Sequence, residues 1–432
     1  MSGSKFFFST MQTLLGKLTL AFIAIIFSTS FLHAQPPLKQ IVSIPWGTEQ
    51  DYLGADICKM ANGTYTIAST LTPNHRGKEN SRANLYRVFT SDGRLTYQFQ
   101  PQQAKYLSGA LVEDMRIYLS NAQNKIYRCQ LPSNAIDSIQ TEYSPLYLLS
   151  REYRGKKSIL VTSSSGYYLY DAATLALTQQ IPTSKPISST GKPPIAGDKI
   201  YCLKQGNEIV CYNLNTKKTV WSVATTAKAA KWLGITVGTF DDVFLHYALN
   251  KDGSTLYAIT GFGCIYKINA ATGAVLKQVE RFRGDANNAG LVTEFSFADV
   301  NGDGVEDLIG SAVDYNLYAI NGKDLSVIWA YNTGYENQAG VSLYDITGDG
   351  IVDVFSINDK MKLSIVNGKT GAKIHEYQIQ PDKSQAKVIL ADINGNGLLD
   401  IFISGGSKAI RAFEMSWVKV PVGSILWMPE GL

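Results

Sequence analysis

Three segments of the chain carry oxygen-bearing side chains at one shared spacing. Positions one, three, five and nine of each segment hold these side chains: Asp299, Asn301, Asp303 and Asp307; Asp345, Thr347, Asp349 and Asp353; Asp392, Asn394, Asn396 and Asp400. Position seven would add a main-chain carbonyl, from Val305, Ile351 or Leu398. Calcium takes six to eight oxygen ligands at about 2.3–2.6 Å. The spacing therefore predicts a calcium site in each segment.

The calcium loop of an EF-hand does not explain this pattern. Position twelve, where an EF-hand has a bidentate Glu, holds Gly310, Ser356 or Ile403, and the flanking residues alternate as strands do. A plain hairpin turn is the other alternative, as at Asp252-Gly253. A turn accounts for two residues, whereas these segments repeat four ligand positions, so calcium loops between strands are favoured.

The three loops differ in negative charge. The first and second loops each contain three aspartates at the predicted ligand positions, whereas the third contains only Asp392 and Asp400, with the amides of Asn394 and Asn396. Because fewer carboxylates bind calcium more weakly, the third loop is expected to be the weakest site.

The strands that hold these loops recur along most of the chain as a strand, a polar turn and a second strand. Aligned repeats place one position at Tyr86, Tyr127, Tyr168, Val210, Tyr266, Tyr318, Ser364 and Arg411. Repeats of about 40–50 residues that are rich in strands indicate the blades of a β-propeller. We predict an all-β propeller of four-stranded antiparallel blades over residues 35–432, with eight blades, or seven if a terminal unit completes its neighbour. Residues 38–44 or 417–427 would close the ring.

Two families of propellers resemble this pattern. The calcium loops resemble FG-GAP or VCBS repeats, as in integrin-like propellers, over about residues 291–415. The turn Asn269-Ala270-Ala271-Thr272-Gly273, with Trp221 or Trp329 on an outer strand, resembles the repeat of quinoprotein-like propellers. These resemblances imply a propeller with bound calcium. They leave open a binding module, an enzyme or an envelope assembly scaffold, because one fold hosts many functions.

The N-terminus indicates export. Residues 1–34 combine Lys5 and Lys17 with an apolar stretch and end in a small residue, Ala34, as a secretory signal peptide does. Cleavage there would leave no membrane-spanning segment, and the next cysteine, Cys58, lies too far on for a lipid anchor. The formal charge of +4 is scattered, so nucleic acid is not an expected partner. A monomer, secreted or held in the periplasm or at the cell surface, is expected.

Side chains that could form an active site are sparse. The three histidines after the leader, His75, His246 and His375, are not spaced for a zinc pair, and no nucleophile elbow or phosphate loop is present. No catalytic residue is predicted. A calcium-binding module for a protein or a glycan is the favoured function. A quinoprotein-like dehydrogenase, a polysaccharide lyase and an envelope assembly scaffold are the alternatives.

Two interpretations are possible for Cys202 and Cys211: a disulfide, or two small apolar side chains. A two-residue turn at Gly206-Asn207 would set Cys202 opposite Cys211, where an exported protein could form a disulfide. Alternatively, both are small apolar residues on one face of a hairpin.

Overall fold

The chain is built from strands. The computed structural model describes residues 35–45, 51–59, 65–73, 85–99, 107–113, 115–121, 123–131, 133–143, 145–163, 165–182, 192–226, 228–232, 235–261, 263–280, 292–312, 314–335, 340–379, 388–403, 405–406 and 409–427. All regular structure in these ranges is β, as predicted, and none of it is a helix that could cross a membrane. The predicted leader, 1–34, lies outside the described residues.

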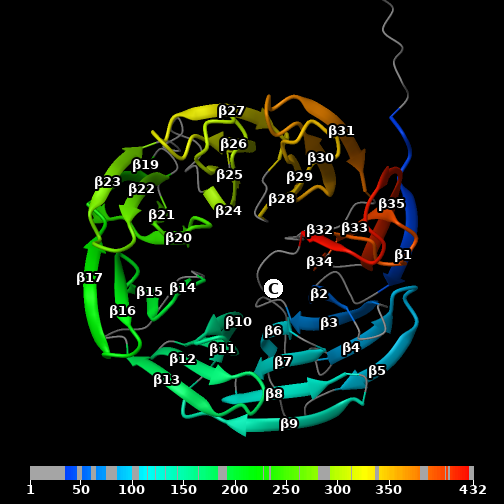
Figure 1. Ribbon diagram of the computed structural model, residues 1–432, viewed down its shortest axis with the longest axis horizontal. Coiled ribbons are helices and arrows are strands. Elements are labelled where there is room, and N and C mark those ends of the chain that lie inside the picture. Colours follow the sequence, from blue (N-terminus) through cyan, green and yellow to red (C-terminus); the bar gives the residue numbers. More distant parts are fainter. Residues whose placement is uncertain are drawn as a thin grey trace, which may run out of the picture. The chain divides into compact units, whose positions relative to one another are not determined.

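The unit Lys39–Leu432 forms a ring of eight antiparallel blades, numbered here in chain order (Figure 1). Blades 1 to 4 contain β2 (Asp51–Lys59), β3 (Tyr65–Pro73), β4 (Leu85–Thr90) and β5 (Leu95–Phe99); β6 (Leu107–Glu113), β7 (Arg116–Asn121), β8 (Lys125–Gln130) and β9 (Ala135–Gln140); β10 (Pro145–Tyr153), β11 (Lys156–Ser163), β12 (Gly166–Asp171) and β13 (Leu177–Pro182); β14 (Ile195–Ala196), β15 (Lys199–Lys204), β16 (Glu208–Asn213) and β17 (Lys218–Ala224).

Blades 5 to 7 repeat this plan, and blade 8 varies it. They contain β20 (Phe244–Leu249), β21 (Thr255–Thr260), β22 (Cys264–Asn269) and β23 (Val275–Glu280); β24 (Val292–Ala298), β25 (Asp307–Ala312), β26 (Asn316–Ile320) and β27 (Val327–Asn332); β28 (Ser342–Tyr344), β29 (Asp353–Ile357), β30 (Lys362–Val366) and β31 (Lys373–Gln378); β32 (Val388–Ala391), β33 (Leu398–Ile403), β35 (Ala409–Lys419) and β1 (Lys39–Pro45). The eight-bladed prediction is confirmed.

The N-terminal strand closes the ring. β1 pairs with β35 as the outermost strand of blade 8, so residues 38–44 supply the predicted clasp. At the C-terminal end, β36 (Ile425–Trp427) instead pairs with the innermost strand, β32. A two-residue strand, β34 (Gly405–Gly406), pairs with β2 of blade 1. These pairings join the two ends of the ring and cover edges that would otherwise be open.

The turn between the third and fourth strands explains the recurring phrase in the sequence. An Asp or Asn begins this turn in blades 3 to 7, and its side-chain oxygen accepts hydrogen bonds from nearby main-chain N–H groups, which is a typical Asx turn. In blade 5, for example, Asn269 Oδ1 accepts the N–H groups of Ala271 and Thr272 at 3.0 and 2.9 Å. The eight aligned positions, from Tyr86 to Arg411, all lie on the third strand of their blades.

Tryptophan side chains join neighbouring blades. Trp221 of blade 4 donates a hydrogen bond from Nε1 to the carbonyl of Ala270 in blade 5, at 3.0 Å. Its ring packs on Gly273, where an added Cβ would lie 2.7 Å from the indole. Gly273 also has a φ of +75°, which favours glycine. The Thr-Gly turn and the Trp are therefore two halves of one contact between blades.

One stretch with helical periodicity contains a strand. Residues 225–233 carry the longest such pattern, yet Lys228–Trp232 is strand β18, which pairs with β19 (Ile235–Asp241) in a separate two-stranded sheet. Pairing with a neighbouring strand overrides the local preference here.

Candidate metal centre

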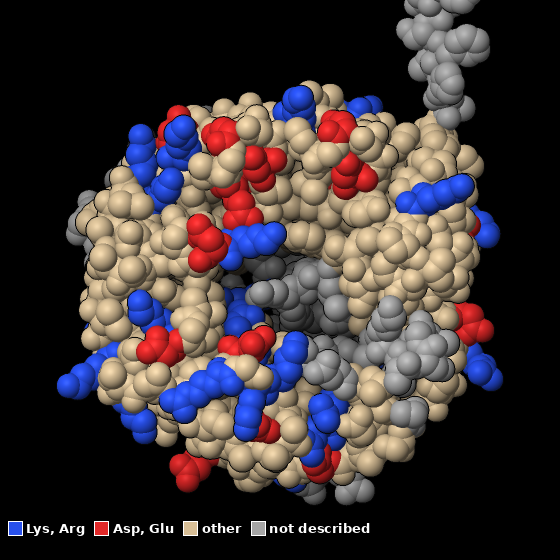
Figure 2. Space-filling model, viewed as in Figure 1, with Lys and Arg blue, Asp and Glu red and all other residues tan. Residues whose placement is uncertain are grey.

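The three predicted calcium loops lie at equivalent positions in three consecutive blades. We name them loop 6 (299–307), loop 7 (345–353) and loop 8 (392–400) after their blades. Each joins the first strand of its blade to the second. Figure 2 shows acidic side chains gathered in separate groups over blades 6 and 7, on the face that it presents.

Loop 6 is folded by hydrogen bonds to its own carboxylates. Asp299 Oδ1 accepts the N–H of Gly302 at 2.7 Å, and Oδ2 accepts that of Gly304 at 2.9 Å. Asp303 Oδ1 accepts the N–H of Val305 at 2.9 Å. Gly302 and Gly304 have φ values of +76° and +81°, so these glycines permit the tight reversal.

The remaining polar atoms of loop 6 turn toward one another. Asn301 Nδ2 lies 3.4 Å from Asp303 Oδ2 and 3.5 Å from Asp307 Oδ1. Asn321 Nδ2, from the turn after the third strand, also lies 3.4 Å from Asp303 Oδ2. The structure therefore brings the side chains at positions three, five and nine of loop 6 together and adds Asn321.

Loop 7 repeats this arrangement. Asp345 accepts the N–H groups of Gly348 and Gly350 at 2.7 and 2.8 Å, and Asp349 accepts that of Ile351 at 2.9 Å. The Thr347 hydroxyl lies 3.4 Å from Asp345 Oδ1. Hydroxyl and carboxylate oxygens are the ligands of a hard cation, so the donor set fits calcium.

Loop 8 has the same backbone course with fewer charges of its own. Asp392 Oδ1 accepts the N–H of Asn396 at 3.0 Å, and Oδ2 accepts that of Gly397 at 2.9 Å. Asn396 Oδ1 accepts the N–H of Leu398 at 3.0 Å. In addition, Gly423 donates its N–H to Asp392 Oδ2 at 2.7 Å, so the C-terminal segment holds this loop.

The last carboxylate of each loop is completely buried: Asp307, Asp353 and Asp400. Burial raises the pKa of Asp307 and of Asp353, although main-chain N–H groups oppose the change. Burial raises the pKa of Asp400 to about 7, and the charges of Asp392 and Glu414 add to this rise. Among the described residues, no positively charged side chain offsets the burial of these three carboxylates, and a divalent cation would do so.

Sequence reasoning missed the segment that faces loop 6 and the one that faces loop 7. Gly322 donates its N–H to Asp307 Oδ1 at 3.0 Å, and Gly368 donates its N–H to Asp353 Oδ1 at 3.2 Å. Both glycines follow an Asn, Asn321 or Asn367, that lies fourteen residues after the last aspartate of its loop. This constant spacing was the available signal.

Calcium itself remains a prediction. Among the residues that the structure describes, no group of three or more His, Cys, Asp or Glu side chains is close enough to hold a metal by itself. An ion in these loops would therefore depend on amide, hydroxyl and main-chain oxygens as well, including the carbonyls of Val305, Ile351 and Leu398.

The predicted disulfide is wrong. The hairpin pairs Cys202 with Val210 and Tyr201 with Cys211, because its turn contains three residues and not two. Gln205 and Gly206 adopt φ values of +58° and +79° in this turn. A shift of one residue sends neighbouring side chains to opposite faces. Cys202 accordingly packs between blades 3 and 4, Cys211 packs between blades 4 and 5, and both are free thiols.

A partly open pocket of about 670 Å³ lies on the inner side of the ring, and Figure 2 shows a hollow at the centre of the ring. First strands of several blades line the pocket. Phe295, Phe297 and Trp427 lie among its aromatic lining residues, and Arg151, Lys192, Lys251, Asp252 and Glu306 are its charged ones. The pocket therefore combines aromatic side chains, which suit binding, with charged side chains of the kind that an enzyme site uses.

Comparisons with known proteins agree with this architecture. Residues 245–429, less than half of the chain, match the family described as outer membrane protein assembly factor BamB, which has quinoprotein-like repeats. No curated protein matches the sequence at a significant level. The match covers blades 5 to 8 and supports the quinoprotein-like resemblance, whereas the FG-GAP or VCBS resemblance remains a prediction.

Solved structures share the fold over most of the chain. BamB from Moraxella catarrhalis aligns with a TM-score of 0.55 at 14% identity, over 88% of this chain and 100% of that one. Sqt1 from Saccharomyces cerevisiae aligns with a TM-score of 0.63 at 12% identity, over 87% and 98%. The computationally designed Ika8 protein aligns with a TM-score of 0.59 at 9% identity, over 87% and 100%. At these identities the likeness establishes the propeller fold.

Proposed function

We propose that this chain is an exported interaction module: a calcium-stabilised propeller that binds a protein or a glycan. The observation that carries this proposal is a group of exposed side chains, Tyr315, Tyr335 and Lys360, which we name the tyrosine patch. Tyr315 and Tyr335 are 37% and 50% exposed. Tyrosine supplies a large contact area with a polar end at a low entropy cost, which suits a binding surface.

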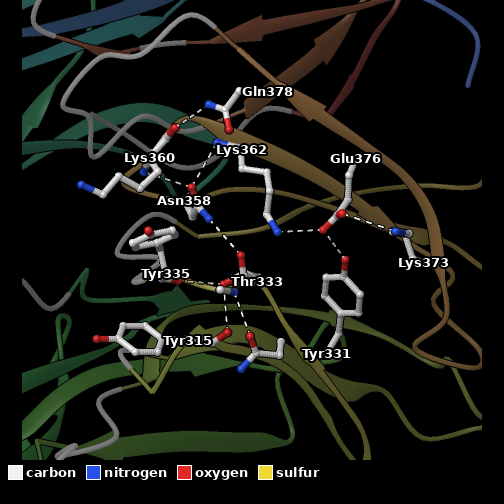
Figure 3. A network of polar contacts seen from close by, with 12 residues as sticks. Tyr315, Tyr331, Thr333, Tyr335, Asn358, Lys360, Lys362, Lys373, Glu376 and Gln378 are labelled. Carbon is white, nitrogen blue, oxygen red and sulfur yellow. Dashed lines mark hydrogen bonds and ion pairs between the residues drawn. The ribbon is translucent and has the colours of Figure 1, made fainter.

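The tyrosine patch is held by a buried polar network (Figure 3). The hydroxyl of Thr333 lies 2.9 Å from the carbonyl oxygen of Tyr315 and 2.7 Å from that of Tyr335. Asn358 donates to the carbonyl of Thr333 at 3.1 Å and accepts the N–H of Lys360 at 3.0 Å. Thr333 and Asn358 are buried. These bonds fix the main chain beneath all three patch residues.

The three side chains extend to the same side of this network (Figure 3). Lys360 Nζ lies 5.4 Å from the centre of the Tyr335 ring, within the range of a cation–π contact. The patch therefore offers two aromatic rings and a positive charge without the cost of ordering a mobile loop.

Paired alanine variants test this proposal. We expect Tyr315→Ala with Tyr335→Ala to abolish binding to envelope glycans on an array, or photo-crosslinking to an envelope protein, without lowering the melting temperature. Leu276→Ala is the matched control, because Leu276 is 53% exposed on blade 5. Unchanged binding by the double variant would place the interaction elsewhere on the ring.

A narrower version of this function is an envelope assembly scaffold. The match of residues 245–429 to outer membrane protein assembly factor BamB supports it. Crosslinking to outer-membrane protein precursors in cells would favour this version, whereas binding of an isolated glycan would favour the broader one.

A further inference from the structure

Blade 8 differs from blades 6 and 7 at the position that faces the last carboxylate of its loop. Asp400 pairs with Glu414 across β33 and β35. Glu414 follows Asp400 by fourteen residues, the spacing that separates Asp307 from Asn321 and Asp353 from Asn367. Blade 8 therefore has a carboxylate at the position where its neighbours have an amide.

The missing turn of blade 8 explains this difference. Asn321 and Asn367 begin the turn to the fourth strand, and Asn367 Oδ1 accepts the N–H of Thr370 at 3.0 Å. In blade 8 the third strand, β35, continues to Lys419, and β1 from the N-terminus supplies the fourth strand. Glu414 therefore lies within a strand and, unlike Asn321 and Asn367, does not begin a turn.

The side chain of Glu414 lies against the loop. It is only 3% exposed. Its Oε2 lies 2.6 Å from Asn396 Nδ2 and 3.4 Å from Asn394 Nδ2, and its Oε1 lies 3.2 Å from Lys39 Nζ on β1. Two of these three contacts are with the predicted ligand side chains of loop 8.

A second observation points to a cation at the same place. Asp400 is completely buried, and its Oδ2 accepts the N–H of Ile393 at 2.8 Å. Among the described residues, no hydrogen-bond donor reaches its Oδ1. The equivalent atoms of Asp307 and Asp353 accept an N–H from Gly322 and Gly368. A buried carboxylate oxygen without a partner is costly, and a metal ion would satisfy it.

We propose that Glu414 is a ligand of loop 8, which makes a calcium site from Asp392, Asp400, Glu414 and the amide oxygens of Asn394 and Asn396. This inference rests on the proposed function, because it takes calcium binding by the loops as given. With Glu414 the site would have three carboxylates, as many as loop 6 or loop 7, and in each of these loops the carboxylates would have to close around the ion together with the amide, hydroxyl or main-chain oxygens. Loop 8 is then no longer the weakest site, and Glu414 also joins it to the closing strand through Lys39.

Terbium luminescence on the purified mature protein tests this assignment. Terbium(III) occupies calcium sites and emits when a nearby aromatic ring is excited. Tyr65 donates its hydroxyl to the carbonyl of Gly423 at 2.8 Å, beside Asp392, so it reports on loop 8. Tyr257 donates to the carbonyl of Gly322 at 2.8 Å and reports on loop 6. Tyr65→Phe and Tyr257→Phe therefore separate the two signals.

The key variant is Glu414→Gln. Because a charged ligand is lost, we expect the terbium affinity measured from the Tyr65-dependent signal to fall by about tenfold or more. The affinity for calcium, measured by competition with terbium, should fall in parallel. Glu376→Gln is the matched control: Glu376, on blade 7, is another glutamate that pairs with a lysine, Lys362, at 2.8 Å. The control should leave both signals unchanged.

Other outcomes separate this inference from the proposed function. An unchanged Tyr65-dependent affinity in Glu414→Gln overturns the inference, as does the absence of that signal while the Tyr257-dependent one persists. Absence of both signals overturns calcium binding itself. If Glu414→Gln does not fold, Lys39→Gln replaces it. Loss of the Lys39 ammonium frees Glu414 to bind the ion, so the terbium affinity of loop 8 should stay the same or rise. A lower affinity counts against the assignment.

Discussion

Trp329 of blade 6 and Gly368 of blade 7 are joined by a hydrogen bond of 2.7 Å from the indole Nε1 to the glycine carbonyl. The N–H of the same glycine donates to Asp353 Oδ1 in loop 7. One residue thus connects the joint between two blades to a candidate calcium loop. Gly368 is packed so closely that an added Cβ would lie 1.7 Å from the carbonyl oxygen of Val352.

Gly368→Ala should therefore destabilise the protein severely, by roughly 4 kcal/mol or more, because the main chain of loop 7 would have to move. Gly348→Ala is the control, since its Cβ would meet open space and only its φ of +73° opposes the change, at about 1 kcal/mol. Urea denaturation measures both. Equal midpoints for the two variants would contradict the close packing at Gly368.

Calcium should raise the melting temperature. If a loop binds with a Kd of about 10 μM, about 1 mM calcium stabilises the folded state by roughly 2.7 kcal/mol per site. Asp303→Ala should reduce this effect more than Asn396→Ala, because it removes a charged ligand rather than a neutral one. Magnesium should substitute poorly, since it demands stricter octahedral geometry. Thermal melts with calcium, with magnesium and with chelator test this prediction. Identical wild-type curves in all three would mean that the loops are plain turns that bind no calcium.

Glu376 should contribute stability that depends on pH. Lys362 Nζ and the Tyr331 hydroxyl lie 2.8 and 2.6 Å from its Oε1 (Figure 3). Burial alone would raise the pKa of Glu376, but the hydrogen bonds from Lys362 and Tyr331 outweigh it and lower that pKa below 4.5. The stabilisation is therefore complete above the pKa of an unfolded glutamate and is lost as the pH falls through the lower, folded value.

The test compares wild type with Glu376→Gln in urea at pH 7 and near pH 3. We expect the variant to be less stable at pH 7, by roughly 1 kcal/mol, and the difference to shrink in acid. A difference that stays constant between the two pH values would show that Glu376 acts through packing and not through its charge.

Cys202 and Cys211 should react slowly with a thiol reagent in the folded protein. Both are buried, and burial raises the pKa of Cys211 to about 11, which leaves little reactive thiolate. Mass spectrometry after alkylation in denaturant, without reductant, should find both modified. Recovery of a Cys202–Cys211 bridge would contradict the register of the hairpin.

Much of the fold could be predicted from the sequence because its signals are local and repeated. Strand, polar turn and strand recur at a period that suits a blade, and the aligned positions from Tyr86 to Arg411 lie on equivalent strands. The loops could be located in the same way, since their ligand types and glycines lie within nine residues. Local hydrogen bonds, such as those from Gly302 and Gly304 to Asp299, need no distant partner.

Only the tertiary structure determined which side chains face one another. A positive φ at Gln205 added one residue to a turn and sent Cys202 and Cys211 to opposite sides of blade 4, which the spacing of the residues alone does not determine. Glu414 faces Asp400, and Lys39 reaches Glu414 from 375 residues away, because the N-terminal strand completes the last blade. Sequence order determined the elements, and closure of the ring determined which distant charges share one buried space.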